Sequence, residues 1–312
     1  EPSISELDEV VLVGYGTQLK KEVTGAVSVL GTKDIQKLNP VRVEQALQGT
    51  VAGVNVSVQS GAPGAGVNIR IRGISTNGDA SPVIIIDGYQ GDMGSLNPAD
   101  ISSITVLKDA QAAIYGTIGA NGVILVTTKQ GQKNSPTQVS IESSLGFQNS
   151  SRMIPVLNAK EYGILLNEAF TNDGRFPPVS NVSALGEGTN WQNELFETAI
   201  IQRNVVNITG GSETTNYSIG ASTLRQDGII GKDKSGFMRN TLRSNIGFEL
   251  SKKISLNTSI IYTNIKRQSV NDFGLGSVLF NALNMPSILS VYDENNNYKL
   301  APSNLGIEII NP

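Results

Sequence analysis

Over the second half of the chain, apolar residues alternate with polar ones at the spacing of two that is typical of β-strands. The first such run carries its apolar residues at Val139, Ile141, Leu145 and Phe147. Similar runs cover 217–222, 242–250 and 254–262, whereas the run 200–209 is less regular and does not reveal which of its faces points outward. Strands with one apolar and one polar face predict the antiparallel sheet of a transmembrane β-barrel.

The connections between these runs alternate in length. The segments 149–198 and 268–312 are long, 227–236 is intermediate, and 210–216 and 251–253 are short. Because such barrels have short periplasmic turns and long extracellular loops, we expect the first strand to run outward. In that orientation the aromatic residues of the apolar face fall at two opposite membrane interfaces, and they are Phe147, Tyr217, Phe248 and Tyr262.

The barrel strands are too few to close a barrel. About five can be counted, and each crossing needs about ten residues. The smallest outer-membrane barrels have about eight strands, and an open edge in lipid would leave backbone groups unpaired. We therefore expect the chain to be the N-terminal part of a longer polypeptide.

The first half of the chain has shorter and more mixed elements. A helix is expected over 41–48, ending at Gly49, and half-buried strands are expected over 54–58 and 67–72. The glycine-rich loop 60–66 is followed by a strand, which argues against a phosphate-binding site because that site needs a helix N-terminus. This half of the chain is predicted to be an α+β domain.

Two further segments complete this domain. A buried strand over 83–86 leads into a turn at Asp87 and Gly88. The segment 104–131 is expected to form a strand, a helical turn over 108–115 and a second strand over 123–128. The reversal between its strands is assigned to glycine backbone angles at Gly116, Gly119 and Gly122.

Composition excludes several kinds of chemistry. The 312 residues include neither Cys nor His, which removes thiol, thiolate–metal and imidazole chemistry. The net charge of −3 gives no reason to expect nucleic acid. Only a carboxylate pair could act catalytically, and the sequence places no two acidic residues together in a credible active-site cleft. We expect no catalytic residue, no metal site and no cofactor.

The long loop after the first barrel strand contains a helical pattern over 158–170, with Asn158 as N-cap and Glu161 completing a capping box. Trp191 is the single tryptophan. It could stack on a sugar ring or anchor the loop through apolar contacts.

Three motifs of the chain follow the order of the plug domain in SusC-like, TonB-dependent outer-membrane transporters, which the chain closely resembles. They are DEVVLVGYGTQLKKEVTGAV (8–27), RGISTNGDASPVIIIDG (72–88) and the segment 104–131. Ile118 departs from the family, which usually carries a basic residue there. The resemblance implies a TonB box and linker over 1–20, a plug over 21–132, and barrel strands with extracellular loops over 133–312, from a barrel of roughly 22 strands.

The resemblance also implies a function and partners. Oligosaccharides or peptides would be actively imported across the outer membrane of a Gram-negative, Bacteroidota-like bacterium. A SusD-like lipoprotein would cover the extracellular face, the TonB-ExbB-ExbD motor would act from below, and two such pairs would form a dimer in outer-membrane lipid. The alternatives are a siderophore or vitamin receptor, and a non-transporting receptor or adhesin on the same scaffold.

The resemblance assigns roles to individual residues. The TonB box is Asp8, Glu9, Val10, Val11, Leu12 and Val13, although the pattern alone fits a first plug strand equally well. The plug-motif and gate residues are Arg70, Arg72, Gly73, Asp87, Gly88, Gly116, Gly119, Asn121 and Gly122. The two arginines either pair structurally with carboxylates of the barrel wall or form a gate whose salt bridges yield under force.

Deleting 7–13 should leave a folded barrel and abolish energised uptake, because the coupling protein would lose the backbone edge to which it adds a strand. Uptake of a labelled substrate by cells that carry the deletion measures this effect. Unchanged uptake would remove the TonB-box assignment.

Overall fold

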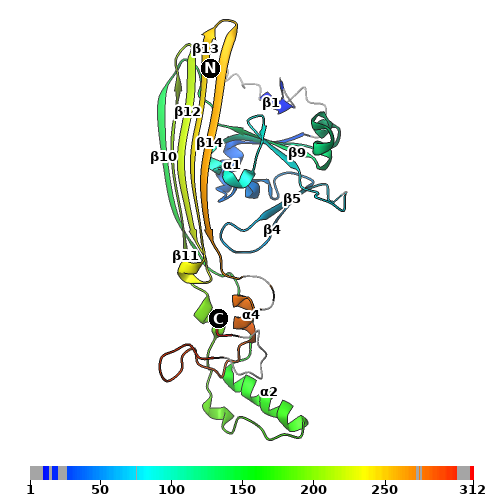
Figure 1. Cartoon of the computed structure of the whole chain (residues 1–312), viewed down its shortest axis with the longest axis vertical. Coiled ribbons are helices and arrows are strands. Elements are labelled where there is room, and N and C mark those ends of the chain that lie inside the picture. The colour runs from blue at the N-terminus through cyan, green and yellow to red at the C-terminus, as the bar shows by residue number, and fades with distance from the viewer. Residues whose placement is uncertain are drawn as a thin grey trace, which may run out of the picture.

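The computed structural model describes residues 10–13, 16–19, 27–74, 76–271, 274, 276–300 and 310–312. A tall, curved antiparallel sheet forms one side of the molecule, and an α+β domain lies against one of its faces (Figure 1). Loops and short helices gather at one end of the sheet (Figure 1). The architecture is therefore a plug domain followed by barrel strands, as the sequence predicts.

The tall sheet has five strands, each paired with its neighbours in chain order. They are β10 (Ser135–Gln148), β11 (Ala199–Gly211), β12 (Thr215–Asp227), β13 (Gly236–Ser251) and β14 (Ile254–Gln268). The connections at one end are 149–198 and 228–235, and those at the other end are 212–214 and 252–253. This alternation of long and short connections confirms the predicted arrangement of the loops.

The two faces of this sheet differ as the alternation predicts. On β13 the polar residues Arg239, Thr241 and Arg243 are buried against the plug, whereas Leu242 and Phe248 are exposed on the opposite face. On β11, where the sequence left the orientation open, Arg203 is buried and Val206 is exposed. The polar face therefore covers the plug, and the apolar face points away from it.

The plug contains a mixed five-stranded sheet in the order β3-β8-β9-β6-β7. Its strands are β3 (Val27–Gly31), β6 (Val83–Ile86), β7 (Tyr89–Gln90), β8 (Ile101–Leu107) and β9 (Val123–Thr128). Among the described strands only β6 and β9 pair in parallel, and a separate hairpin joins β4 (Val54–Val58) to β5 (Val67–Ile71). Val43, Leu47, Ile104 and Ile124 belong to the buried core between these elements.

Short helices connect these strands and occupy the loops. In the plug they are α1 (Thr32–Leu38) and the 3₁₀ segments η2 (Val43–Leu47), η3 (Met93–Ser95), η4 (Pro98–Asp100) and η5 (Asp109–Asn121). Beyond the plug they are α2 (Ala159–Asn172), η6 (Val182–Ala184), α3 (Trp191–Leu195), η7 (Lys232–Lys234) and α4 (Val278–Asn284). None of the described helices is long and apolar enough to cross a membrane.

Two predictions for the extracellular loops can be compared with the structure. Asn158 caps α2 and forms the capping box with Glu161, as predicted. Trp191 is buried beside Ala282 and Met285, and its indole nitrogen donates to the Pro286 carbonyl at 3.0 Å. The indole therefore anchors α3 to the segment around α4 and is not available for stacking on a sugar.

Three local predictions in the plug are wrong in detail. The helix expected over 41–48 is the shorter 3₁₀ segment η2. The helical turn expected over 108–115 is the longer 3₁₀ segment η5, with its kink at Gly116. Gly116 and Gly122 have the positive φ values that glycine allows, but Gly119 does not. A Cβ atom at Gly119 would instead collide with the carbonyl oxygen of Ala112, so this glycine is required by close packing.

Gly119→Ala should lower the free energy of unfolding of the full-length protein by about 1–3 kcal/mol, because the added methyl overpacks the turn. Gly61→Ala is the matched control, because a Cβ atom there would meet nothing within 4 Å. Urea denaturation of both variants measures the difference. Equal stability of the two variants would contradict this packing argument.

Candidate functional site: the seam between plug and barrel wall

Three arginines point from the inward face of the barrel sheet into the plug. These wall arginines are Arg203 on β11 and Arg239 and Arg243 on β13, with relative exposures of 9%, 2% and 1%. Arg203 donates to the carbonyl of Pro40 at 3.2 Å, and Arg239 to that of Gly94 at 3.0 Å. Arg243 donates to the carbonyl of Lys129 at 2.6 Å. The wall thus holds the plug by its backbone.

The plug offers these carbonyls because they lie where its regular elements end. Pro40 follows α1, Gly94 lies within η3, and Lys129 follows β9. A backbone carbonyl at such a position needs a donor from outside the element when it is buried. A guanidinium group has five N–H donors and can bond more than one group at a time. The seam therefore pairs orphan acceptors of the plug with buried donors of the wall.

An ion pair adds to the seam at Arg243. Its Nε lies 3.4 Å from Oδ1 of Asp100, and both side chains are almost fully buried. Burial raises the pKa of the Asp100 carboxyl, and the charge of Arg243 opposes that rise. A Cβ atom at Gly220 on β12 would lie 2.7 Å from the same Oδ1. Glycine at this position therefore leaves room for the carboxylate to reach the wall.

A hydrogen-bond network joins the β6–β7 turn to the wall. The Asp87 carboxylate accepts from the Thr128 amide at 2.8 Å and from its hydroxyl at 2.6 Å. The Thr128 hydroxyl in turn accepts from the Asn245 side chain at 2.6 Å, and Ser259 donates to Asn245 at 2.7 Å. Ser259 also lies 3.4 Å from Asp87. Asp87 therefore shapes a turn and connects the plug to β13 and β14.

The remaining seam contacts are both apolar and polar, and Ile261 of β14 packs against the apolar core of the plug. The Thr263 hydroxyl donates to the Ser95 carbonyl at 2.9 Å, and within the wall Arg203 pairs with Glu142 of the adjacent strand β10 at 2.6 Å. Among the residues that the structure describes, several buried seam atoms lack a hydrogen-bond partner, including Arg203 Nε, Asp100 Oδ1 and Asn207 Oδ1. Water can replace such polar contacts more cheaply than it can hydrate an apolar core. Separating the plug from the wall at these polar contacts therefore costs less free energy than exposing an apolar core would.

Of the predicted plug-motif and gate residues, Asp87 contacts the barrel wall, whereas the hydrogen bonds of Arg70 stay within the plug. Arg70 donates to the Ile69 carbonyl and the Ser81 hydroxyl, each at 3.0 Å and both within the plug. The strand expected over 67–72 is one residue shorter, because β5 ends at Ile71 and Arg72 adopts a φ of 57°, so the two arginines do not lie on one strand face. A gate formed by these two arginines stays a prediction.

The other predicted residues have local roles in the plug. Positive φ values occur at Gly73, Gly88, Gly116 and Gly122. Asn121 donates to the Asp79 carbonyl at 2.9 Å, which ties the end of η5 to the loop before β6. These contacts shape turns, and none of them is a contact with the barrel wall.

Of the predicted TonB box, Asp8 and Glu9 lie outside the described residues. Val10–Val13 form β1, which pairs antiparallel with β2 (Gly16–Leu19). The assignment of this segment as a TonB box stays a prediction. The described part of the chain contains no group of His, Cys, Asp or Glu side chains that could hold a metal ion.

Sequence reasoning did not identify the wall arginines or Asp100. The available signal was an arginine at inward positions of alternating strands, as in FMRNTLRSN on β13. A charge on the inward face needs a partner, but the partners are carbonyls 114 to 163 residues away in the chain. No local sequence pattern shows which backbone carbonyl of the plug will accept a hydrogen bond from a wall arginine.

Arg243→Gln should lower the free energy of unfolding by about 3–5 kcal/mol at neutral pH, because it removes the ion-pair partner of the buried Asp100 and leaves the weaker attraction of Lys129. Since burial raises the pKa of Asp100 above its ordinary 3.8, the lost stability should return as the pH falls toward that value and the carboxyl becomes neutral. Urea denaturation across this pH range measures both effects.

The double variant Asp100→Asn/Arg243→Gln should recover part of the loss and show no such pH dependence. Arg225→Gln is the matched control, because its ion pair with Asp227 is exposed and exposed pairs contribute less than about 1 kcal/mol. A loss at Arg243 as small as that of the control would contradict the role given to this pair.

Comparison with known proteins agrees with the fold. Residues 19–123 match the TonB-dependent Receptor Plug Domain family. TonB-dependent receptor P3 of Formosa agariphila is 34% identical over 99% of this chain, and TonB-dependent receptor SusC of Bacteroides thetaiotaomicron is 35% identical over 82% of it. The chain spans 30% and 26% of the lengths of these two relatives.

Among solved structures, the RagAB peptide importer in its open-open state superposes with a TM-score of 0.81 at 25% identity. The match covers 93% of this chain and 36% of the importer chain. Plug, wall strands and their order are therefore shared with proteins of known architecture. The chain is similar over nearly its whole length to the N-terminal part of SusC-like TonB-dependent receptors, which are outer-membrane β-barrel proteins.

Proposed function

We propose that this chain provides the plug and the first wall strands of an active importer that brings oligosaccharides or peptides across the outer membrane. The seam is the observation that carries the proposal. A separately folded domain lies against the inward face of the barrel sheet and is held there by polar contacts to its backbone. Such a domain can block a channel and still be released.

The ends of the molecule support a direction of transport. The loop group with α2 and α4 lies at one end of the sheet, and β1 lies toward the other end (Figure 1). Long loops are extracellular in barrels of this kind, so β1 faces the periplasm. A periplasmic protein that adds a strand to 8–13 would pull on the plug from the side opposite the captured substrate.

The proposed partners follow from the relatives. A SusD-like lipoprotein would cover the extracellular loops, TonB-ExbB-ExbD would provide the force, and two importer–lipoprotein pairs would form a dimer. RagAB is described as a peptide importer, which supports peptides as one class of cargo. We propose no enzymatic activity, because the chain lacks the His and Cys residues on which most such sites depend.

Two measurements on the full-length protein test this proposal. Purification from outer membranes should recover a surface lipoprotein and a bound oligosaccharide or peptide, which mass spectrometry identifies. Uptake of that ligand should fall to the level of passive leakage in cells without TonB, because the plug then stays seated. TonB-independent uptake, or recovery with neither lipoprotein nor ligand, would contradict the proposal.

A further inference from the structure

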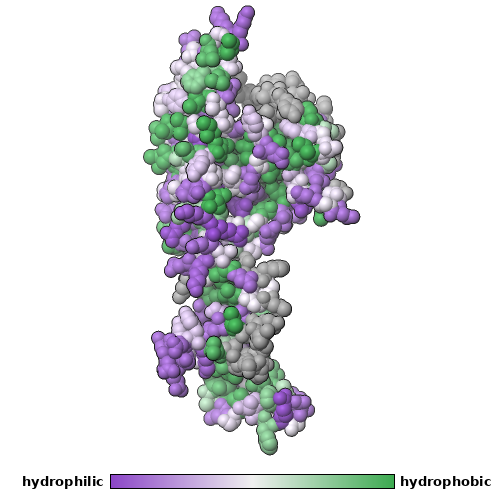
Figure 2. All heavy atoms as spheres, viewed as in Figure 1, coloured by the Kyte–Doolittle hydropathy of each residue, from purple (hydrophilic) through white to green (hydrophobic). Residues whose placement is uncertain are grey.

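The outward face of the barrel sheet changes character near its extracellular end. Exposed apolar residues cover most of this face, and they include Val139, Ile141, Leu145, Phe147, Val206, Ile219, Leu242, Phe248, Leu256, Ile260 and Tyr262. Hydrophilic residues gather where the sheet meets the loop group (Figure 2). This boundary is the level at which an apolar band gives way to lipid headgroups.

Two cations lie at this boundary, on the two strands that flank β13. The register pairs Arg225 of β12 with Met238 of β13, and Met238 with Lys266 of β14. Met238 lies four residues from the outward Leu242, so the three residues form one row on the outward face. We call this set the rim row.

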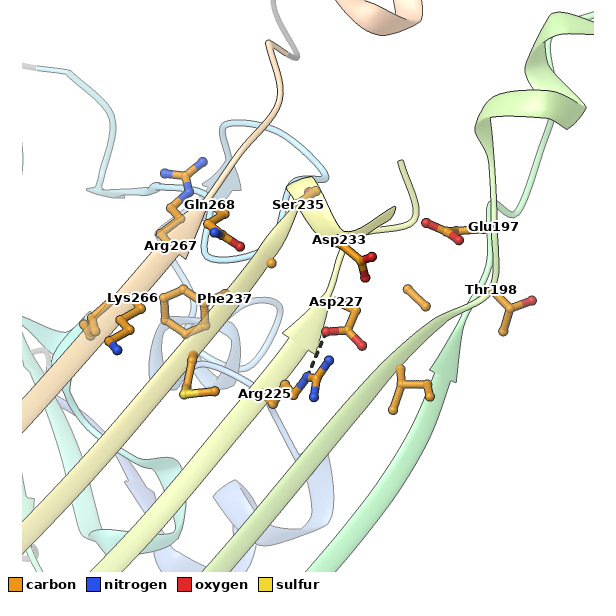
Figure 3. Close-up of a pocket in the computed structure, with 16 residues that line it drawn as sticks. Glu197, Thr198, Arg225, Asp227, Asp233, Ser235, Phe237, Lys266, Arg267 and Gln268 are labelled. Atoms are coloured by element: carbon orange, nitrogen blue, oxygen red, sulfur yellow. Dashed lines mark hydrogen bonds and ion pairs between the residues drawn. The ribbon is translucent and has the colours of Figure 1, made fainter. Parts of the chain in front are cut away.

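The rim row borders a concave surface. Arg225, Met238 and Lys266 line a depression of about 820 Å³ (Figure 3). A second depression of about 420 Å³ lies deeper in the apolar band, and its lining includes Ala221, Thr223, Asn240, Leu242 and Tyr262. Thr223 and Asn240 are each two residues from the rim row along their strands, so the second depression begins where the first ends.

The cations of the rim row are available for an anion. Arg225 uses Nε to bind Asp227 at 3.0 Å. Within the described residues, its two terminal nitrogens and the ammonium of Lys266 have no hydrogen-bond partner. Glu197 and Asp233 also line the depression (Figure 3), but Glu197 precedes β11 and Asp233 lies in η7, so both are beyond the loop-side ends of the strands. A group approaching from the membrane therefore meets the cations first.

We propose that the rim row and the second depression, which forms a groove below it, together bind one phosphorylated lipid of the outer leaflet. Its phosphate contacts Arg225 and Lys266, because guanidinium and ammonium groups are strong donors to phosphate. One acyl chain lies in the groove beside Tyr262, where small side chains leave space for it. The groove continues the lipid-facing surface, and the two cations of the rim row complement the negative charge of the phosphate. This site does not depend on which cargo is imported.

Native mass spectrometry of the delipidated full-length protein tests the proposal, with diphosphoryl lipid A as the probe and phosphatidylcholine and inorganic phosphate as comparisons. The wild type should retain lipid A in preference to phosphatidylcholine. Arg225→Gln/Lys266→Gln should weaken retention roughly tenfold or more, since each substitution removes a charge-assisted hydrogen bond. Inorganic phosphate should not displace the lipid, because it cannot fill the groove.

The matched control is Lys252→Gln/Lys253→Gln, which removes two exposed cations from the short turn at the opposite end of the sheet. It should retain lipid A as the wild type does. If the double variant at the rim fails to fold, Lys266→Gln alone serves, because this ammonium makes no hydrogen bond or ion pair within the described residues. Equal loss in rim and control variants, equal retention of the two lipids, or displacement by phosphate would each overturn the proposal.

Discussion

Buried guanidinium groups that donate to backbone carbonyls connect the two parts of this molecule. Arg203, Arg239 and Arg243 each project from a wall strand and each reach the end of a plug element. A carbonyl is present whatever side chain the plug residue carries. The seating of the plug therefore depends on the path of its backbone, which the plug core fixes, as well as on plug side chains such as Asp100 and Asp87.

Much of the fold could be predicted because its signals are local. The alternation on β10, β12, β13 and β14 has a period of two and needs no knowledge of partners, and the same holds for the capping box at Asn158. The buried strands β6 and β9 also have the bounds that their apolar runs indicate. The alternation of apolar and polar residues shows which residues share a face of each strand, and strands with one apolar face predict the sheet.

The seam could not be predicted, because it depends on distant pairs. Arg243 is one polar residue among others on an alternating strand until β9 and η4 place Lys129 and Asp100 beside it. Gly119 shows the same limit, since its neighbour Ala112 lies too close for a side chain only once η5 has formed. The arginines singled out from the motif, Arg70 and Arg72, lie elsewhere.

The strand order of the plug has a mechanical consequence. β3 lies at one border of its sheet and is bonded to a single neighbour, β8, while β8 is also held by β9. If the proposed coupling protein pulls on the N-terminal side, the tension reaches β3 before any other strand of this sheet. Detaching β3 breaks its hydrogen-bond ladder with β8. The ladders among the other four strands stay intact, so the plug can unfold in stages.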